Sequence, residues 1–259
     1  MTNRRHREWD AGAYETLNGP MTTRGNDAVA RLALRGDETV LDAGCGTGAV
    51  TATLLERLPR GRVAALDGSA EMLEAARVRF AGDPRVSLLH ADLERPLPRG
   101  RESVDAVVST STFHWVRDHV SLFRHLATVL RPGGQLVVDC GGAGNIAAVL
   151  EALRDLGFAD HPWTYADVEE TERRLRAAGF ADADVRLTPR VSRHAPDELE
   201  RFLTSVVLRT FVAELGDEAG ARLVRDVAAR LPDGELRWVR LEIAARRQRS
   251  GRVERSAST

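Results

Sequence analysis

Lysine is absent from this sequence of 259 residues, and all 37 basic residues are arginine. A lysine Schiff base and a lysine general base are therefore excluded, so the substrate must be handled by other groups. The sequence also lacks a surplus of one charge, because 37 basic residues stand against 38 acidic ones and the formal net charge is −1. That balance leaves no basic field for nucleic acid.

Cysteine and long hydrophobic runs are scarce as well. Only Cys45 and Cys140 occur, each at the end of a predicted core strand, which indicates a reducing compartment rather than a disulfide framework. Cysteine and histidine show no metal-ligand spacing, so no metal site is expected. No apolar run approaches the ~18 residues of a membrane span, and the polar residues 1–10 do not resemble a signal peptide. We therefore expect a cytoplasmic protein with no membrane or nucleic-acid partner.

The stretch Val40–Gly48, VLDAGCGTG, carries the strongest local signal. An apolar start followed by three glycines at alternate positions predicts a buried parallel strand that turns abruptly into a helix. Gly44, Gly46 and Gly48 allow a ligand to approach the main chain closely, and the first N–H groups of the helix point toward it. Asp42, at the carboxyl end of the strand, repels a pyrophosphate and suits a cationic ligand.

Strands and helices alternate along the rest of the chain. Strands are predicted over residues 39–42, 62–66, 86–90, 104–109, 135–140, 185–191 and 236–244. Helices are predicted over residues 9–17, 27–34, 49–58, 70–80, 120–130, 145–156, 166–178, 196–215 and 218–231. Residues 19–20, Gly-Pro, are expected to separate the first two helices, and residues 131–134 to form a turn. The alternation predicts an α/β fold with a doubly wound, mostly parallel sheet.

Polar residues gather at the carboxyl ends of the predicted strands, where such sheets bind their ligands. Asp42, Asp67, Asp92 and Ser109 all lie at these ends. Asp67 follows the glycine-rich loop by about 20 residues, the offset of an acid that accepts from ribose hydroxyls. Asp92 can accept from an adenine amino group. The sequence therefore predicts a nucleoside-binding site.

Two nucleoside ligands compete for this site. Gly44, Gly46 and Ala49 also satisfy the dinucleotide fingerprint, and Asp67 has the matching offset. An NAD-dependent oxidoreductase therefore remains an alternative. Against it, Asp42 precedes the loop, and a pyrophosphate would find no arginine nearby.

Four segments together resemble the class I S-adenosylmethionine-dependent methyltransferases: Val40–Gly48, residues 65–69, residues 91–93 and LRPGGQL at residues 130–136. The stretch STSTFHWVRDH, residues 109–119, is most like the trans-aconitate methyltransferase group. The resemblance implies a Rossmann-like, seven-stranded sheet with an antiparallel last strand. It also implies S-adenosyl-L-methionine as cofactor and methyl transfer to an oxygen, nitrogen or carbon of a small molecule. A cofactor-binding cyclase or a non-catalytic binding protein are the alternatives within this fold.

The resemblance further implies roles for individual residues. The loop glycines approach the methionine part of the cofactor, Asp67 holds the ribose hydroxyls, Asp92 meets the adenine N6 group and Ser109 lies near the methionine amine. The full set of expected cofactor-binding residues is Asp42, Gly44, Cys45, Gly46, Thr47, Gly48, Asp67, Gly68, Ser69, Met72, Asp92, Leu93, Ser109 and Thr110.

His114 is the candidate general base, because it follows the fourth predicted strand directly and an ordinary histidine pKa near ~6.5 suits proton removal at neutral pH. The competing interpretation is a packing histidine stacked with Trp115. Tyr14, in the expected N-terminal helices, is a second candidate for contact with the cofactor or for catalysis, and His194 is a weaker one. Methyl transfer itself depends mainly on alignment and needs a base only if the acceptor must lose a proton.

The expected domain organisation has three parts: an N-terminal helical cap over residues 1–35, a methyltransferase domain over residues 36–246 and a disordered tail over residues 247–259. Residues 141–165 and 196–231 are too long for simple connections, so we expect them to form an inserted helical lid over the acceptor.

The acceptor pocket is predicted only in outline. Trp163, Phe202 and Phe211 offer an apolar wall in the lid segments. A tricarboxylate acceptor would require inward-facing arginines for bidentate recognition, and Arg24, Arg193 and Arg209 are the candidates.

Overall fold

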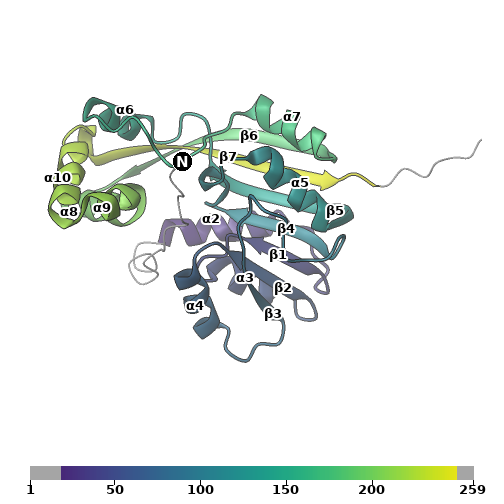
Figure 1. Ribbon diagram of the computed structural model, residues 1–259. Helices are drawn as coiled ribbons and strands as arrows, with labels where there is room; N and C mark the ends of the chain where they lie inside the picture. The colour runs from purple at the N-terminus through teal and green to yellow at the C-terminus, as the bar shows by residue number, and fades with distance from the viewer. Residues whose placement is uncertain (1–18, 250–259) are drawn as a thin grey trace, which may run out of the picture.

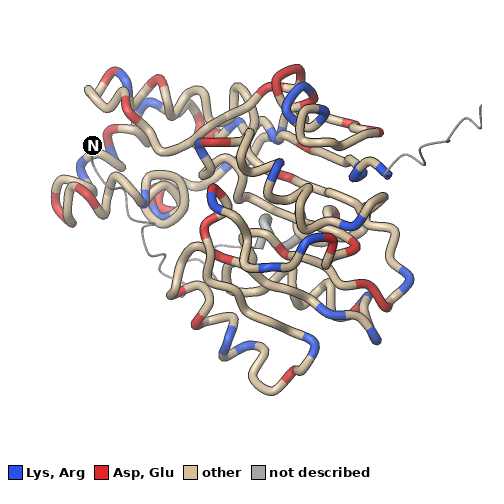
Figure 2. Tube along the Cα trace, turned by 45° about the vertical axis from the view of Figure 1, so that its right-hand side comes forward, with Lys and Arg blue, Asp and Glu red and all other residues tan. Residues whose placement is uncertain are grey.

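The computed structural model of the chain describes residues 19–249. The predicted helix over residues 9–17, Tyr14 and most of the predicted tail lie outside these described residues. Within them, none of the helices is long and apolar enough to cross a membrane. Basic and acidic residues are interspersed along the trace (Figure 2).

Seven strands form one sheet in the order β3-β2-β1-β4-β5-β7-β6 (Figure 1). The strands are β1 (Thr39–Ala43), β2 (Arg62–Asp67), β3 (Val86–His90), β4 (Val104–Thr110), β5 (Leu130–Gly141), β6 (Phe180–Arg193) and β7 (Glu235–Arg247). Strands β1 to β5 are parallel to one another, and β7 runs antiparallel between β5 and β6. This topology confirms the predicted α/β sheet with its antiparallel last strand.

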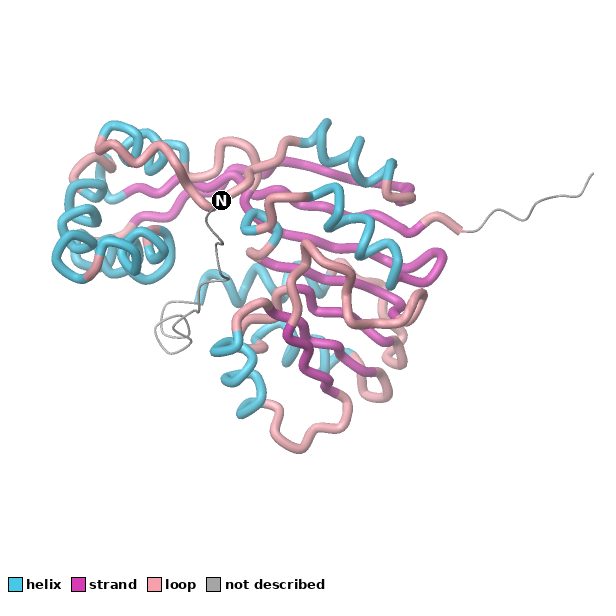
Figure 3. The backbone as a smooth tube through the Cα atoms, in the orientation of Figure 1, coloured by secondary structure: helices cyan, strands magenta, loops and turns pink. Residues whose placement is uncertain are grey.

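Helices cover both faces of the sheet and form a separate group at one side (Figure 3). Their bounds are α2 (Gly19–Ala30), α3 (Ala49–Arg57), α4 (Ala70–Arg79), α5 (His119–Val129), α6 (Ala147–Asp155), α7 (Val168–Ala177), α8 (Pro196–Phe202), α9 (Arg209–Leu215) and α10 (Asp217–Ala228). Short 3-10 turns are η1 (Phe113–Trp115) and η3 (Pro232–Gly234), and η2 (Leu203–Val207) is a π-helical segment. Ser69 caps α4, because its side chain accepts from the Met72 amide.

Alternate residues of the central strands pack into opposite helical layers, as the period of a strand requires. Val63 and Ala65 of β2 belong to the buried clusters formed with α2, α3 and α4. Ala64 and Leu66 of the same strand belong to the cluster that includes α5 and α7. Burial on both faces explains why the strands read as nearly continuous apolar runs.

A second hydrophobic core holds α6, α8, η2, α9 and α10 together, on the left of Figure 1. The long strands β6 and β7 reach into it. Leu236 near the start of β7 packs in this second core, whereas Leu241 and Ile243 of the same strand pack in the core of the sheet. We call α6, α8, η2, α9 and α10 the helical subdomain; its role as a lid stays a prediction.

Three local predictions are wrong. Residues 19–20 begin α2 instead of breaking the chain, since proline is tolerated in the first turn of a helix. The predicted helix over residues 196–215 is divided into α8, the π-helical η2 and α9. The predicted turn at residues 131–134 belongs to β5, because Leu130 already pairs with Val104 and the register shifts before Gln135.

Candidate functional site

The glycine-rich loop joins β1 to α3 and is fixed to the end of β2. The amides of Gly44 and Cys45 both donate to the Leu66 carbonyl, with N···O distances of 2.7 and 2.9 Å. The amide of Gly48 donates to the Cys45 carbonyl at 2.9 Å and closes the turn into α3. These bonds hold the loop at the carboxyl ends of β1 and β2, where the sequence predicted a ligand.

The loop glycines differ in what surrounds them. A Cβ atom on Gly44, at φ +85°, would lie 2.1 Å from Thr112 Oγ1, and one on Gly48 would lie 2.4 Å from the Phe80 ring. A Cβ atom on Gly46, at φ +54°, would meet no atom of residues 19–249 within 4 Å. Among these residues, Gly44 and Gly48 therefore pack against side chains, whereas Gly46 does not. We therefore expect a ligand to approach the loop at Gly46.

Asp67 ties this open part of the loop to the end of β2. Its Oδ2 accepts from the Gly46 amide at 2.8 Å, and its Oδ1 accepts from the Ser69 amide at 2.9 Å. Asp67, the predicted ribose acid, thus lies directly beside Gly46.

Asp42 lies buried at the end of β1, with 1% of its surface exposed. Its Oδ2 accepts from the Thr51 hydroxyl at 2.6 Å, while its buried Oδ1 has no partner among residues 19–249. Burial raises the pKa of Asp42 to about 7, and the charge of Asp67 acts in the same direction. A buried acceptor without a partner costs free energy, so this position favours a cationic ligand and disfavours a phosphate.

The remaining predicted cofactor residues follow β2 and β3. Asp92 comes two residues after β3, and its Oδ1 accepts from the Glu94 amide at 2.9 Å. The Gly68 carbonyl lies 3.1 Å from His90 Nε2. Leu93 and Met72 are buried. In the loop itself, Cys45 is buried and burial raises the pKa of its thiol, which leaves it unreactive. Thr47 is buried as well.

Ser109 has a different environment from the one that the resemblance implies. Its side chain is fully buried, and its hydroxyl donates to the Ala43 carbonyl at 2.6 Å. The hydroxyl therefore links β4 to β1 and leaves its proton unavailable to a ligand. Thr110, the last residue of β4, is partly exposed, and its carbonyl accepts from the Thr112 hydroxyl at 2.9 Å.

A second polar cluster lies at the ends of β4, β5 and β7. Arg240 Nε donates to Asp139 Oδ1 at 2.8 Å, and its Nη2 bonds to the same oxygen. Nη2 also donates to the Ser111 hydroxyl at 3.2 Å. Arg240 and Asp139 are both buried. Ser111 has φ 53°, a left-handed conformation that is uncommon for a residue other than glycine and often marks a functional segment.

His114 belongs to this cluster. The Gly141 amide donates to His114 Nδ1 with an N···N distance of 3.2 Å, so the neutral ring carries its proton on Nε2. Burial lowers the pKa of His114 to about 3, and the nearby charge of Arg240 and the ring of His119 act in the same direction. The premise of an ordinary histidine pKa is therefore wrong. His114 is a neutral hydrogen-bond donor at physiological pH and a poor proton acceptor.

Aromatic rings connect this cluster to the helical subdomain. His114 stacks on Tyr165, with ring centroids 6.0 Å apart, and contacts Trp115 as predicted. Tyr165 stacks in turn on Trp163, which contacts Phe211 of α9. The Tyr165 hydroxyl bonds to Asn145, and burial raises its pKa. Trp163 and Phe211 are buried in the core of the subdomain, and a role in the wall of the acceptor pocket stays a prediction.

The other histidine and arginine candidates, His194, Arg193 and Arg209, are not among the residues of this polar cluster. His194 stacks on Phe202 at 5.0 Å, inside the subdomain. Arg193 is exposed and pairs with Glu235. Arg209 begins α9, and the side chain of Arg24 is not among those described. Sequence reasoning missed Arg240, whose sole signal is a charge within a predicted core strand.

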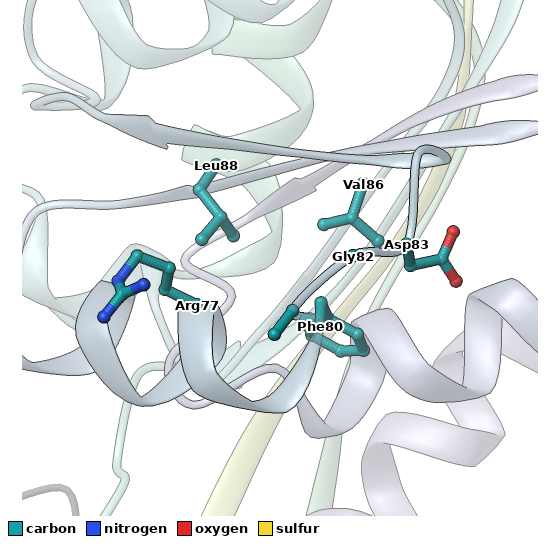
Figure 4. A pocket seen from close by; sticks show the side chains of 7 residues that line it. Arg77, Phe80, Gly82, Asp83, Val86 and Leu88 are labelled. Carbon is teal, nitrogen blue, oxygen red and sulfur yellow. The ribbon is translucent and has the colours of Figure 1, made fainter.

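A pocket on another part of the sheet lies apart from this site. It opens between the carboxyl end of α4 and the exposed edge strand β3 (Figure 4). Its lining residues are Arg77, Phe80, Ala81, Gly82, Asp83, Val86 and Leu88. None of the predicted site residues lines it.

Comparison with known proteins supports the interpretation of the glycine-rich loop. Residues 40–134 match the family model described as a methyltransferase domain. A trans-aconitate 2-methyltransferase of Azoarcus sp. (strain BH72) is 38% identical over 131 residues, 51% of this chain and 50% of that protein. Another, of Paracidovorax citrulli (strain AAC00-1), is 30% identical over 175 residues, 68% of this chain and 65% of that protein. The chain thus spans between half and two thirds of the length of these relatives.

The fold is similar to that of solved methyltransferases. The structure of phosphoethanolamine N-methyltransferase 2 of Haemonchus contortus, in complex with phosphomonomethylethanolamine and S-adenosylhomocysteine, superposes with a TM-score of 0.65. It is 20% identical in sequence and covers 93% of this chain and 57% of its own.

The topology, the loop and the sequence matches define a class I S-adenosylmethionine-dependent methyltransferase fold, and the chain belongs to that superfamily. Within it, the chain is of the trans-aconitate methyltransferase type in sequence. The site residues fit that cofactor: Gly46 opens toward the ligand, and Asp42 holds a buried acceptor without a partner. They fit the pyrophosphate of NAD poorly, because the acid Asp42 lies buried at the end of the strand that leads into the loop.

Proposed function

We propose that the chain transfers the methyl group of S-adenosylmethionine to a small-molecule acceptor. The observation that carries this proposal is the ligand-facing Gly46, flanked by the unpartnered Oδ1 of Asp42 and by the carboxylate of Asp67. When bound, the cofactor supplies an electrophilic methyl group on a sulfonium sulfur. Asp42 favours its positive charge, Asp67 accepts from the ribose hydroxyls and Asp92 accepts from the adenine amino group.

The chain contributes to the reaction mainly by alignment. In-line displacement needs the acceptor atom, methyl carbon and sulfur in one arrangement, and such positioning is worth about 7–11 kcal/mol when the geometry is near attack. The glycine-rich loop fixes one side of this arrangement. The cluster around His114 and the helical subdomain lie on the other side of the switch point between β1 and β4.

The acceptor that we propose is a carboxylate, methylated on oxygen. A carboxylate is already deprotonated at neutral pH, so its methylation requires no general base. His114 offers no useful basicity there, because its pKa lies at about 3. The similar chains from Azoarcus and Paracidovorax are named as methyltransferases of trans-aconitate, a carboxylate. An acceptor with a hydroxyl or ammonium group would require a proton acceptor that this cluster lacks.

Incubation with methyl-labelled cofactor tests this function. The labelled cofactor is supplied with trans-aconitate in one sample, with its trimethyl ester in a second and with a metabolite extract in a third. We expect label in an ester product of the free acid and none from the pre-esterified control. Cofactor-dependent turnover of a metabolite without label transfer would instead identify the cyclase alternative. Binding of the cofactor with no turnover in any sample would identify a binding protein.

The cytoplasmic location and the absence of a nucleic-acid partner stay predictions.

A further inference from the structure

The polar cluster formed by Ser111, His114, Asp139, Gly141 and Arg240, which we call the β5–β7 cluster, carries almost no net charge. Arg240 and Asp139 are buried against each other and cancel. His114 is neutral, because its Nδ1 accepts from the Gly141 amide. The other titratable groups around it are the buried Cys140 thiol, the Tyr165 hydroxyl and His119, and burial disfavours the charged form of each.

Two donors of this cluster remain without a partner among residues 19–249. Arg240 uses Nε and Nη2 for Asp139 and Ser111, which leaves Nη1 unbonded. His114 uses Nδ1 for Gly141, which leaves Nε2–H unbonded. Neither atom is among the fully buried groups that lack a partner, so both remain accessible to a ligand. A side chain as buried as Arg240, with 4% of its surface exposed, gains from a ligand that satisfies its last donors.

The directions of both donors are fixed. Arg240 is held by three bonds to Asp139 and by one to Ser111, so its planar group cannot rotate freely. The ring of His114 is held by the Gly141 amide on one edge and by the stacked Tyr165 ring on one face. Rigid donors of this kind bind an anion with little loss of conformational entropy.

We propose that Arg240 Nη1 and His114 Nε2–H together bind one carboxylate of the methyl acceptor, and that Asp139 positions Arg240 for this contact. The inference rests on the proposed function and names the binding site that the function requires. A singly charged carboxylate fits a cluster whose one arginine is already paired. A carboxylate adds one negative charge to this nearly neutral cluster, where two fixed donors meet it, whereas a doubly charged phosphate would add two negative charges to the same two donors. His114 is thus a substrate-binding donor and not a base.

Calorimetric titration of trans-aconitate into the protein saturated with S-adenosylhomocysteine tests the proposal. His114→Phe keeps a ring against Tyr165 but removes the donor, and Arg240→Lys keeps a cation for Asp139 but removes Nη1. We expect each to weaken binding of trans-aconitate by at least about tenfold, the loss of one hydrogen bond to a charged group. His114→Gln, which retains a donor but no base, should bind more tightly than His114→Phe.

His119→Phe is the matched control, because His119 is equally buried in the same segment and its Nε2 bonds to the Phe113 carbonyl instead. It should bind trans-aconitate within about twofold of the wild type. The ¹⁵N spectrum of the wild type, with the His114 signals assigned from His114→Phe, should report a neutral ring with the proton on Nε2 and a shift of that nitrogen on addition of trans-aconitate.

The outcomes separate this proposal from the proposed function. Unchanged affinity in both His114→Phe and Arg240→Lys, with methyl transfer intact, overturns the carboxylate site and leaves the methyltransferase standing. Failure of the wild type to bind S-adenosylhomocysteine overturns the proposed function itself. If Arg240→Lys does not fold, His114→Phe and the ¹⁵N shift decide the matter. Acetate and phosphate are also tested as competitors of trans-aconitate binding. If phosphate competes as strongly as acetate, the site does not select for a singly charged carboxylate.

Discussion

The two halves of the carboxyl edge of the sheet have opposite electrostatic character. The half formed by β1, β2 and β3 presents three acids, Asp42, Asp67 and Asp92, and the side chain of Asp42 is bonded to the Thr51 hydroxyl. The half formed by β4, β5 and β7 presents Arg240, whose charge Asp139 balances, and a neutral His114. The first half suits a cation and the second an anion. Two ligands of opposite charge can therefore meet at the switch point between β1 and β4.

The halves also differ in how their polar groups are satisfied. Asp67 accepts from the backbone amides of Gly46 and Ser69, whereas Asp139 is bound by a side chain from a strand far along the chain. Removing one member of a buried ion pair strands the other charge in the core. The half formed by β1, β2 and β3 should therefore tolerate mutation better than the half that contains Arg240.

The largest effect that we expect is on stability. Asp139→Ala leaves the buried Arg240 guanidinium without its carboxylate, which should lower the free energy of unfolding by about 3–5 kcal/mol. Asp184→Ala removes an exposed pair with Arg186 and should cost less than about 1 kcal/mol. Urea unfolding followed by circular dichroism measures both. If the two variants lose equal free energy of unfolding, the buried pair stabilises the fold no more than the exposed pair does.

The next effect separates packing from ligand contact within the glycine-rich loop. Gly44→Ala forces a methyl group onto Thr112, at a cost of about 1–3 kcal/mol for overpacking and about 1–2 kcal/mol for the left-handed backbone. Gly46→Ala carries only the backbone cost, because its Cβ enters open space. We expect Gly44→Ala to lose more stability and Gly46→Ala to lose affinity for S-adenosylhomocysteine while remaining folded. Thermal unfolding and calorimetry on both variants decide this, and full affinity in Gly46→Ala would contradict a ligand at that face.

A smaller effect is expected where a single acceptor is removed from the first half. Asp67→Ala should weaken S-adenosylhomocysteine binding by about 1.5–3 kcal/mol, the range for hydrogen bonds to a charged group, and NAD should bind to neither protein. Asp83→Ala is the control, since Asp83 pairs with Arg85 beside the pocket at β3. Calorimetric titration gives both affinities. Wild-type affinity in Asp67→Ala would rule out its role in holding the ribose.

The first half of the site could be predicted from sequence because its residues are close in the chain or lie at successive strand ends. Gly44, Gly46 and Asp67 follow from a glycine pattern and a strand period, and the structure brings them together. The second half could not, because Ser111 follows β4 while Asp139 and Arg240 lie on β5 and β7, and these three strands pair only in the folded sheet. A charge in a strand does not reveal its partner until the register is known.

The pKa of His114 escaped prediction for the same physical reason. Its position after β4 was evident, but its ionisation depends on burial and on Arg240, which arrives from the far end of the chain. The presence of the seven strands and most helix bounds, by contrast, followed from local periodicity. The division of α8 from α9 by the π-helical η2 has no signal in the apolar pattern of residues 196–215.

The smallest effect compares the two halves through pH. The pKa of Asp42 is raised from an ordinary 3.8 to about 7, so its proton stabilises the folded state at low pH and this contribution is lost as pH rises toward 7. The pKa of His114 is lowered from 6.5 to about 3, so the unfolded chain gains protons first as pH falls and stability is lost below about pH 6.5. Between about pH 5.5 and about pH 6.5 each group should change the free energy of unfolding by about 1 kcal/mol, in opposite directions.

Replacing either Asp42 or His114 should reveal the pH dependence of stability that the other residue contributes. Relative to the wild type, Asp42→Asn should gain stability as pH rises through that window, and His114→Phe should gain stability as pH falls through it. Urea unfolding at the two pH values measures both slopes, with Asp83→Asn as a control that should follow the wild type there, because its pKa is held below 3.8 by Arg85. Parallel slopes in all three variants would mean that burial does not shift these groups in opposite senses. The contrast between the two halves would then rest on charge placement alone.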